Sequence, residues 1–151
     1  MKTKCILLTI LVFSSIAAFC NEFVGLWTTI DDETQEKKSV VQIYKSNNQY
    51  YGRVVKKKKN PDSTAKLSGN PKILGLDIIW DMTKKDTRLK GGKILDPKKG
   101  SVYSCEMWRD GENLIVRGKI AFLGRNQTWV PYKGTEISLT TEELVPNILA
   151  K

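Results

Sequence analysis

The sequence predicts an all-β protein, an antiparallel up-and-down β-barrel of about eight strands with a short C-terminal helix. Short runs rich in β-branched and aromatic residues recur along the 151-residue chain, and turn residues separate them. Several runs alternate apolar and polar residues, which is typical of antiparallel strands with one dry face. An open sheet of this many strands would expose two unpaired edges. Closure is therefore expected, and sequential hairpins favour a barrel over a sandwich.

The first 20 residues predict a secretory signal peptide. Lys2 and Lys4 precede an apolar run, Cys5 to Phe19, that is too short and too close to the N-terminus to favour a membrane-spanning helix. Two cleavage points fit this segment, one after Ala18 and one after Cys20. We therefore expect a secreted or periplasmic mature protein that does not span a membrane.

Three strands are expected in the first part of the mature chain. The first covers residues 23–30 and ends at a polar turn. Residues 39–45 and 49–55 are β-rich runs joined by the short turn 46–48, so they predict a hairpin. Gly52 inside the second run predicts a bulge or a close approach of two backbones.

A polar loop over residues 56–71 follows this hairpin. Four consecutive lysines, Lys56 to Lys59, open the loop. We interpret them as a solvated segment that keeps an edge strand from pairing, in preference to a binding patch. The next run, residues 73–82, is ambiguous by period, but Gly75 and the β-branched residues favour a strand.

The remaining barrel strands are expected in a meander over residues 91–122. Residues 96–100 and 110–111 carry the turn signals of this meander. A last strand is expected over residues 126–132. Beyond it, the pattern from Thr140 to Glu143 is a capping box, which predicts a short helix.

This organisation divides the chain into a signal peptide (1–20), one barrel domain (21–134) and a C-terminal tail (135–151). Removing the signal peptide lowers the formal charge from +9 to +7, which favours anionic partners. Export argues against nucleic acid as a partner. Cleavage after Cys20 would leave Cys105 as a single thiol, whereas cleavage after Ala18 would allow a bridge between the two.

The composition argues against most catalytic chemistry. The chain contains no histidine, which removes the commonest general base, the Ser-His-Asp arrangement and imidazole zinc sites. No cofactor or metal site is predicted. A pair of acids could still hydrolyse a glycoside, but most of the acids in question stand in turn-like settings, where Asp bonds its own backbone. We therefore expect a non-enzymatic protein; the acids considered are Asp31, Asp32, Glu33, Asp77, Asp81 and Asp96.

Four segments resemble an uncharacterised family of small exported bacterial proteins, a domain of unknown function (DUF2147) assigned to lipocalin-like, or calycin-like, barrels. These segments are "GLWTTIDDETQ", "SVVQIYKSNNQYYGRVV", "GGKILDPKKGSVYSCEMWRDGENLIVRGKI" and "GRNQTW". They extend from Gly25 to about Trp129 and thus cover nearly all of the mature domain. The chain departs at Asn126, where the family usually has threonine.

The resemblance implies a structural role for Trp27. Lipocalins carry a Gly-x-Trp triplet on the first strand and an arginine near the end of the last strand that packs across the tryptophan. Gly25, Trp27 and Arg125 are similar in kind and order. A guanidinium over an indole gains about 0.5–2 kcal/mol from the cation–π contact. We therefore expect these three residues to close the base of the barrel.

A barrel lumen lined by alternate apolar residues would hold a small hydrophobic or amphiphilic ligand. The alternative is that these side chains fill the lumen, and that the basic surface binds anionic envelope or host polymers instead. The residues expected to line the lumen are Val41, Ile43, Tyr51, Tyr103, Met107, Val116 and Trp129.

Overall fold

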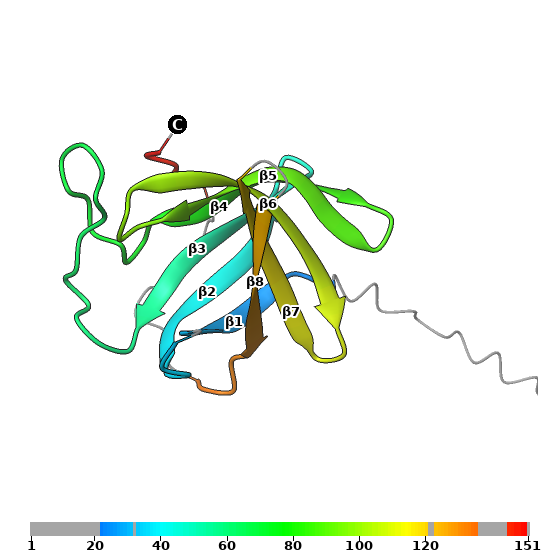
Figure 1. Cartoon of the computed structure of the whole chain (residues 1–151), viewed down its shortest axis with the longest axis horizontal. Coiled ribbons are helices and arrows are strands. Elements are labelled where there is room, and N and C mark those ends of the chain that lie inside the picture. Colours follow the sequence, from blue (N-terminus) through cyan, green and yellow to red (C-terminus); the bar gives the residue numbers. More distant parts are fainter. Residues whose placement is uncertain (1–21, 32, 121–122, 136–144, 151) are drawn as a thin grey trace, which may run out of the picture.

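The protein forms a closed barrel of eight antiparallel strands in sequence order (Figure 1). The computed structural model describes residues 22–31, 33–120, 123–135 and 145–150. The predicted all-β barrel is confirmed, and β1 pairs with β8 to close it. The signal peptide and the predicted helix at Thr140 to Glu143 lie outside the described residues. The strands are β1 (Gly25–Ile30), β2 (Lys37–Ser46), β3 (Gln49–Lys57), β4 (Asp77–Lys85), β5 (Arg88–Asp96), β6 (Ser101–Asp110), β7 (Asn113–Ile120) and β8 (Leu123–Pro131).

Three tight turns connect strands at one end of the barrel. They need residues that tolerate positive φ, and the sequence supplies Asn47 and Asn48 (φ 47° and 64°), Asp86 (54°) and Gly111 (57°). Because the strands run up and down, every second connection returns to the same end. We call this end the closed end, and the opposite end, which carries the longer loops, the open end.

The strand predicted over residues 73–82 begins later than expected. Residues 73–76 belong to the long loop, and β4 starts at Asp77. This loop is nevertheless tied to β3, because the Val54 N–H donates to the Leu76 carbonyl (3.1 Å) and the Gly75 N–H donates to the Val54 carbonyl (2.8 Å). The side chains of this segment pack into the core although its backbone forms no strand. Its apolar pattern therefore resembles that of a strand.

The lysine run is only partly a loop. Lys56 and Lys57 are the last residues of β3 and pair with Val40 and Ser39 of β2. Lys58 and Lys59 are exposed, as expected for a solvated segment. The expectation that the run keeps an edge strand from pairing is wrong, because the closed barrel leaves β3 no free edge.

The inner faces of the strands form one apolar core. The β3–β4 register shifts at Gly52, which confirms the bulge predicted there. A Cβ at Gly52 would lie 3.1 Å from Ile43 Cδ1 and 3.1 Å from Ile79 Cβ, so side chains pack closely against this glycine. The largest fully buried side chains are Trp129, Phe23, Ile43, Leu76, Ile79, Met82, Leu89, Leu95, Met107, Leu114, Val41 and Val54.

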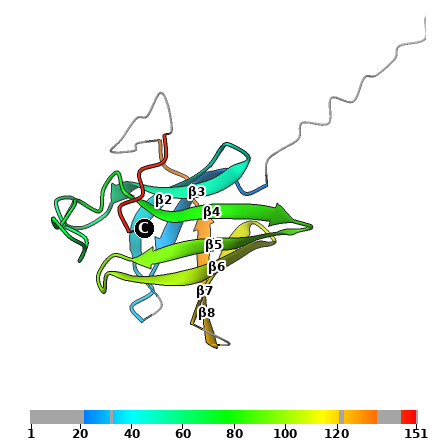
Figure 2. The ribbon, with the colours of Figure 1, turned by 90° about the horizontal axis from the view of Figure 1, so that it is seen from above.

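Residues 145–150, here the C-terminal strap, lie against the outside of the barrel beside β3 and β4 (Figure 2). The strap covers a buried ion pair between Arg53 and Asp77, which are 6% and 1% exposed. Asp77 and Asn147 exchange two hydrogen bonds, one through the Asp77 carboxylate (2.5 Å) and one through its backbone N–H (3.1 Å). Side chains on this part of the outer face are therefore shielded from solvent, as those on the inner face are.

Candidate functional site

Trp27 closes the barrel at the closed end. Its side chain is 4% exposed, and its indole N–H donates to the Phe23 carbonyl at 2.9 Å. The guanidinium of Arg109, at the end of β6, lies 4.8 Å from the centre of the indole ring. Arg109 also donates to the carbonyls of Glu22, Gly111 and Glu112, so it ties the β6–β7 turn to the chain that enters β1.

The arginine over Trp27 is thus Arg109, and the expectation of Arg125 in this role is wrong. Arg125 pairs with Gly118 near the start of β8, whereas Trp27 pairs with Pro131 at its end. Six residues of strand separate these positions by about 20 Å, which exceeds the reach of an arginine side chain. Gly25 has a φ of 148°, so the backbone entering β1 favours glycine for its conformation.

The deep part of the lumen is filled by its own side chains. Five of the residues expected to line it are at most 1% exposed. The strand register places them on one face, because Trp27 pairs with Val41, Met107 with Val116, and Leu114 with Trp129. These five residues are Val41, Ile43, Met107, Val116 and Trp129.

Tyr51 faces the outside of the barrel, so its assignment to the lumen wall is wrong. It lies directly opposite Tyr44 on β2, and the two rings stack at 5.5 Å. Tyr44 in turn donates a 2.8 Å hydrogen bond to Asp77 beneath the C-terminal strap. The neighbouring Gly52 is the residue of β3 that faces inward, against Ile43.

The inward-facing residues nearest the open end are only partly covered, and we call this region the mouth. Tyr103, Ile94 and Gly118 meet there from three adjacent strands. A Cβ on Gly118 would lie 3.5 Å from Ile94 Cγ2 and 3.7 Å from Tyr103 Cβ. Beyond them, Ile120 and Leu123 form a cross-strand pair and are 64% and 68% exposed.

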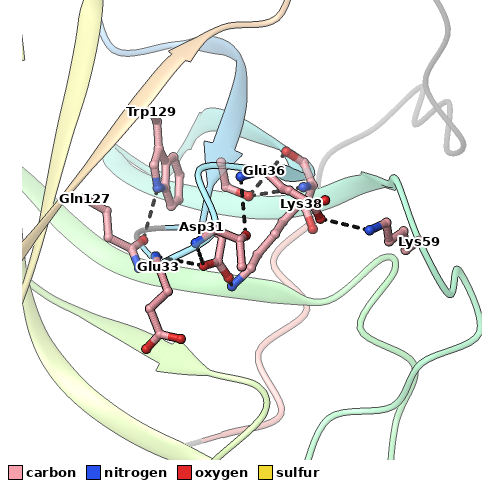
Figure 3. Close-up of polar contacts among 10 residues, drawn as sticks. Asp31, Glu33, Glu36, Lys38, Lys59, Gln127 and Trp129 are labelled. Atoms are coloured by element: carbon pink, nitrogen blue, oxygen red, sulfur yellow. Dashed lines mark hydrogen bonds and ion pairs between the residues drawn. The ribbon is translucent and has the colours of Figure 1, made fainter.

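Figure 3 shows the acidic loop between β1 and β2 together with Gln127 and Trp129 of β8. The Trp129 indole N–H donates to Gln127 Oε1 at 3.2 Å, so the amide satisfies the polar edge of a buried ring. Asp31 accepts hydrogen bonds from the backbone N–H groups of Glu33 and Thr34, both at 2.9 Å. A hydrogen bond from Lys38, together with these N–H groups, holds the pKa of Asp31 well below its usual range.

Four of the acids considered for catalysis make structural contacts. Asp31 caps its own loop, Asp77 pairs with Arg53, and Asp96 accepts from the backbone N–H groups of Lys98 and Lys99. Asp81 accepts a long hydrogen bond from Tyr51 (3.5 Å) on the outside of the barrel. Asp32 lies outside the described residues. Among the residues that the structure describes, no three acid or cysteine side chains are grouped as metal ligands would be.

The family model described as an uncharacterized protein conserved in bacteria (DUF2147) matches residues 25–130. The chain belongs to this family. The match spans all eight strands except the last residue of β8, so the DUF2147 domain is the barrel itself.

A search of solved structures found the protein HP1028 from Helicobacter pylori, described as belonging to the lipocalin family. The two chains share 18% sequence identity with a TM-score of 0.62, and the match covers 74% of this chain and 83% of the other. The DUF2147 barrel is therefore lipocalin-like in fold. No curated protein matches the chain.

The outer wall of the DUF2147 barrel carries a second charged cluster that sequence reasoning missed. Glu106 of β6 is 9% exposed and accepts hydrogen bonds from Arg88 (3.0 Å) and Lys119, with Lys90 at 3.7 Å. The hydrogen bond from Lys119 contributes most to lowering the pKa of Glu106. The four residues of this charged cluster come from three strands. The cluster therefore depends on the strand register, which composition does not reveal.

Arg109 was also missed, although a signal for it exists. The residue directly precedes the Asp110–Gly111 turn, and an up-and-down topology places that turn at the same end as the start of β1. In the DUF2147 barrel the arginine therefore reaches Trp27 from the neighbouring connection, without needing a place on the adjacent strand β8.

Cys105 is a free cysteine buried in the barrel wall of the DUF2147 domain, 4% exposed. Burial raises the pKa of its thiol to about 12. We expect iodoacetamide at pH 8 to label Cys105 at least about 100-fold more slowly in the folded protein than in urea. Mass spectrometry of the Cys105 peptide measures this directly, and equal rates in the two states would contradict the buried assignment.

In the described part of the chain, no helix has the length and apolar character needed to cross a bilayer.

Proposed function

We propose that this protein is a lipocalin-like binding protein that carries a small hydrophobic or amphiphilic ligand at the mouth of its barrel. The observation that carries the proposal is a change in exposure along the inward face of β7. Leu114 and Val116 are 0% and 1% exposed, whereas Ile120 and its partner Leu123 are 64% and 68% exposed. An apolar surface left open at the end of a closed barrel gains about 25 cal/mol per Å² when a ligand covers it.

The ligand would occupy the mouth and leave the deep lumen undisturbed. Met107 and Val116, which are fully packed, would form its floor. Tyr103, which is half-buried at the rim, offers a polar tip on an apolar ring, a combination suited to an amphiphile. The basic and apolar leader at residues 1–20 supports delivery of the protein to the periplasm or the medium.

A variant that fills the mouth tests this proposal. Gly118 has ordinary van der Waals room for one extra carbon beside Ile94 and Tyr103, so Gly118→Ala should fold and bind normally. Gly118→Phe should occupy the mouth and weaken binding of the uncharged probe N-phenyl-1-naphthylamine by at least about tenfold. Fluorescence titration of the probe measures both affinities, and circular dichroism checks that each variant folds.

A second variant tests the proposal even if Gly118→Phe does not fold. Leu123→Asp changes a largely exposed side chain, so it should fold while placing a charge where the apolar part of the ligand would lie. Equal probe binding by the wild type and both variants would overturn the proposal. Because the probe carries no charge, its affinity should also be independent of salt, and a steep loss with salt would favour the surface-polymer alternative.

A further inference from the structure

The outer wall of the barrel holds a groove that is separate from the mouth. Its floor is a row of outward-facing residues that pair across three strands: Val130 with Thr28, and Thr28 with Val40. Lys56 of β3 pairs with Val40 and continues the row. The cavity above this row measures about 510 Å³, which lies within the range of small-molecule sites.

The floor of this groove is dry although it faces away from the lumen. Thr28 and Val40 are only 6% and 4% exposed. The segment 132–134 forms one wall, and the Tyr132 N–H donates to the Leu26 carbonyl at 2.9 Å. The Lys56 ammonium donates to the Tyr132 hydroxyl at 3.1 Å and so joins the floor to this wall. These contacts connect the wall of the groove to strands β1 and β3.

The charged residues around the groove are mostly positive. Four lysines line it against the single acid Glu112. Lys56 is half-buried beside the apolar floor, and the other three are exposed: Lys37, Lys58 and Lys133. Ammonium groups beside Val40, Val130 and Pro131 provide attraction for an anion and an apolar surface within one cavity.

We infer that this groove binds an anionic amphiphile. The apolar body of the ligand lies on Val40 and Val130, and its anionic head meets the lysine ammonium groups. A bare polyanion would use the lysines and leave the apolar floor empty, so the observed combination favours a ligand with both parts. The site lies on the outer wall and goes beyond the ligand proposed for the mouth.

Binding of dodecanoate, below its micellar concentration, tests the inference on the full mature protein. Amide ¹H–¹⁵N spectra should shift at Thr28, Val40 and Lys133. The double variant Lys37→Glu/Lys133→Glu should weaken binding by at least about tenfold. The matched control Lys66→Glu/Lys85→Glu changes the net charge equally at exposed positions outside the groove and should bind as the wild type does.

Two further probes separate the contributions of head and body. Dodecyltrimethylammonium, which keeps the chain and reverses the charge, and sulfate, which has charge and no chain, should both bind at least about tenfold more weakly than dodecanoate. Equal effects of the two double variants, or sulfate binding as well as dodecanoate, would overturn the inference. Shifts confined to Tyr103 and Gly118 would assign the anion to the mouth and would also overturn it. Gly118→Phe should leave dodecanoate binding at the groove unchanged, so the two proposals fail independently.

Discussion

Replacing Asp77 by alanine should lower the free energy of unfolding by about 3–5 kcal/mol. The Asp77 carboxylate is buried and accepts hydrogen bonds from Tyr44 (2.8 Å) and from Arg53 (3.1 and 3.3 Å). Its loss leaves the Arg53 guanidinium, 6% exposed, without its counter-charge, and that uncompensated buried charge is the main cost. Urea denaturation followed by tryptophan fluorescence measures the change.

The same substitution should release the C-terminal strap, because Asn147 donates its backbone N–H to the Asp77 carboxylate. Hydrogen exchange within residues 145–150 should accelerate in Asp77→Ala before the barrel itself unfolds. The double variant Arg53→Met/Asp77→Ala provides the control, since removing both charges should recover part of the loss. A double variant less stable than the sum of the two single variants would contradict this account.

Much of the barrel follows from local sequence signals. Alternation with period two predicts β2, β6 and β7, and residues that tolerate positive φ predict the tight turns between strands. Closure follows from the cost of unpaired edges, which does not depend on details of the register. For this reason the fold could be predicted without coordinates, whereas the role expected for Trp27 came only from the resemblance to lipocalins.

The individual lumen residues could be predicted only in part. Tyr50 and Tyr51 are adjacent and both buried, so hydrophobicity alone cannot decide which of them faces inward. The outer face of β3 is covered by the C-terminal strap, so side chains on that face are buried as well. Period-two reasoning assumes one wet face, and it therefore misplaced Tyr51.

Pairs that are distant in sequence were the other source of error. Arg53 and Asp77 meet only because β3 and β4 pair across a long loop with a shift in register. Asp77 stands inside the strand predicted over residues 73–82, and no local pattern there indicated its buried ion pair with Arg53. The ligand site proposed at the mouth depends on similar information, because Tyr103, Ile94 and Gly118 come from three strands.

Truncating Trp27 to alanine should destabilise the barrel by about 3–5 kcal/mol, since it removes a large buried ring and leaves a cavity at the closed end. Trp27→Phe keeps most of the apolar volume and loses the indole hydrogen bond to Phe23, so its cost should be about 1–2 kcal/mol. Urea denaturation measures both changes.

The arginine variants decide which guanidinium supports the closed end. Arg109→Met should cost about 1–3 kcal/mol, because the cation–π contact with Trp27 and the hydrogen bonds to Glu22, Gly111 and Glu112 are lost together. Arg125→Met is the matched control, and it should cost less than about 1 kcal/mol because Arg125 is exposed. In the Trp27→Ala background, Arg109→Met and Arg125→Met should lower the free energy of unfolding by more similar amounts, because Arg109 then has no ring to cover. If Arg125→Met lowers the stability of the wild type more than Arg109→Met does, the assignment of the closing arginine to Arg109 is refuted. The arginine of β8 would then be the one that supports the closed end.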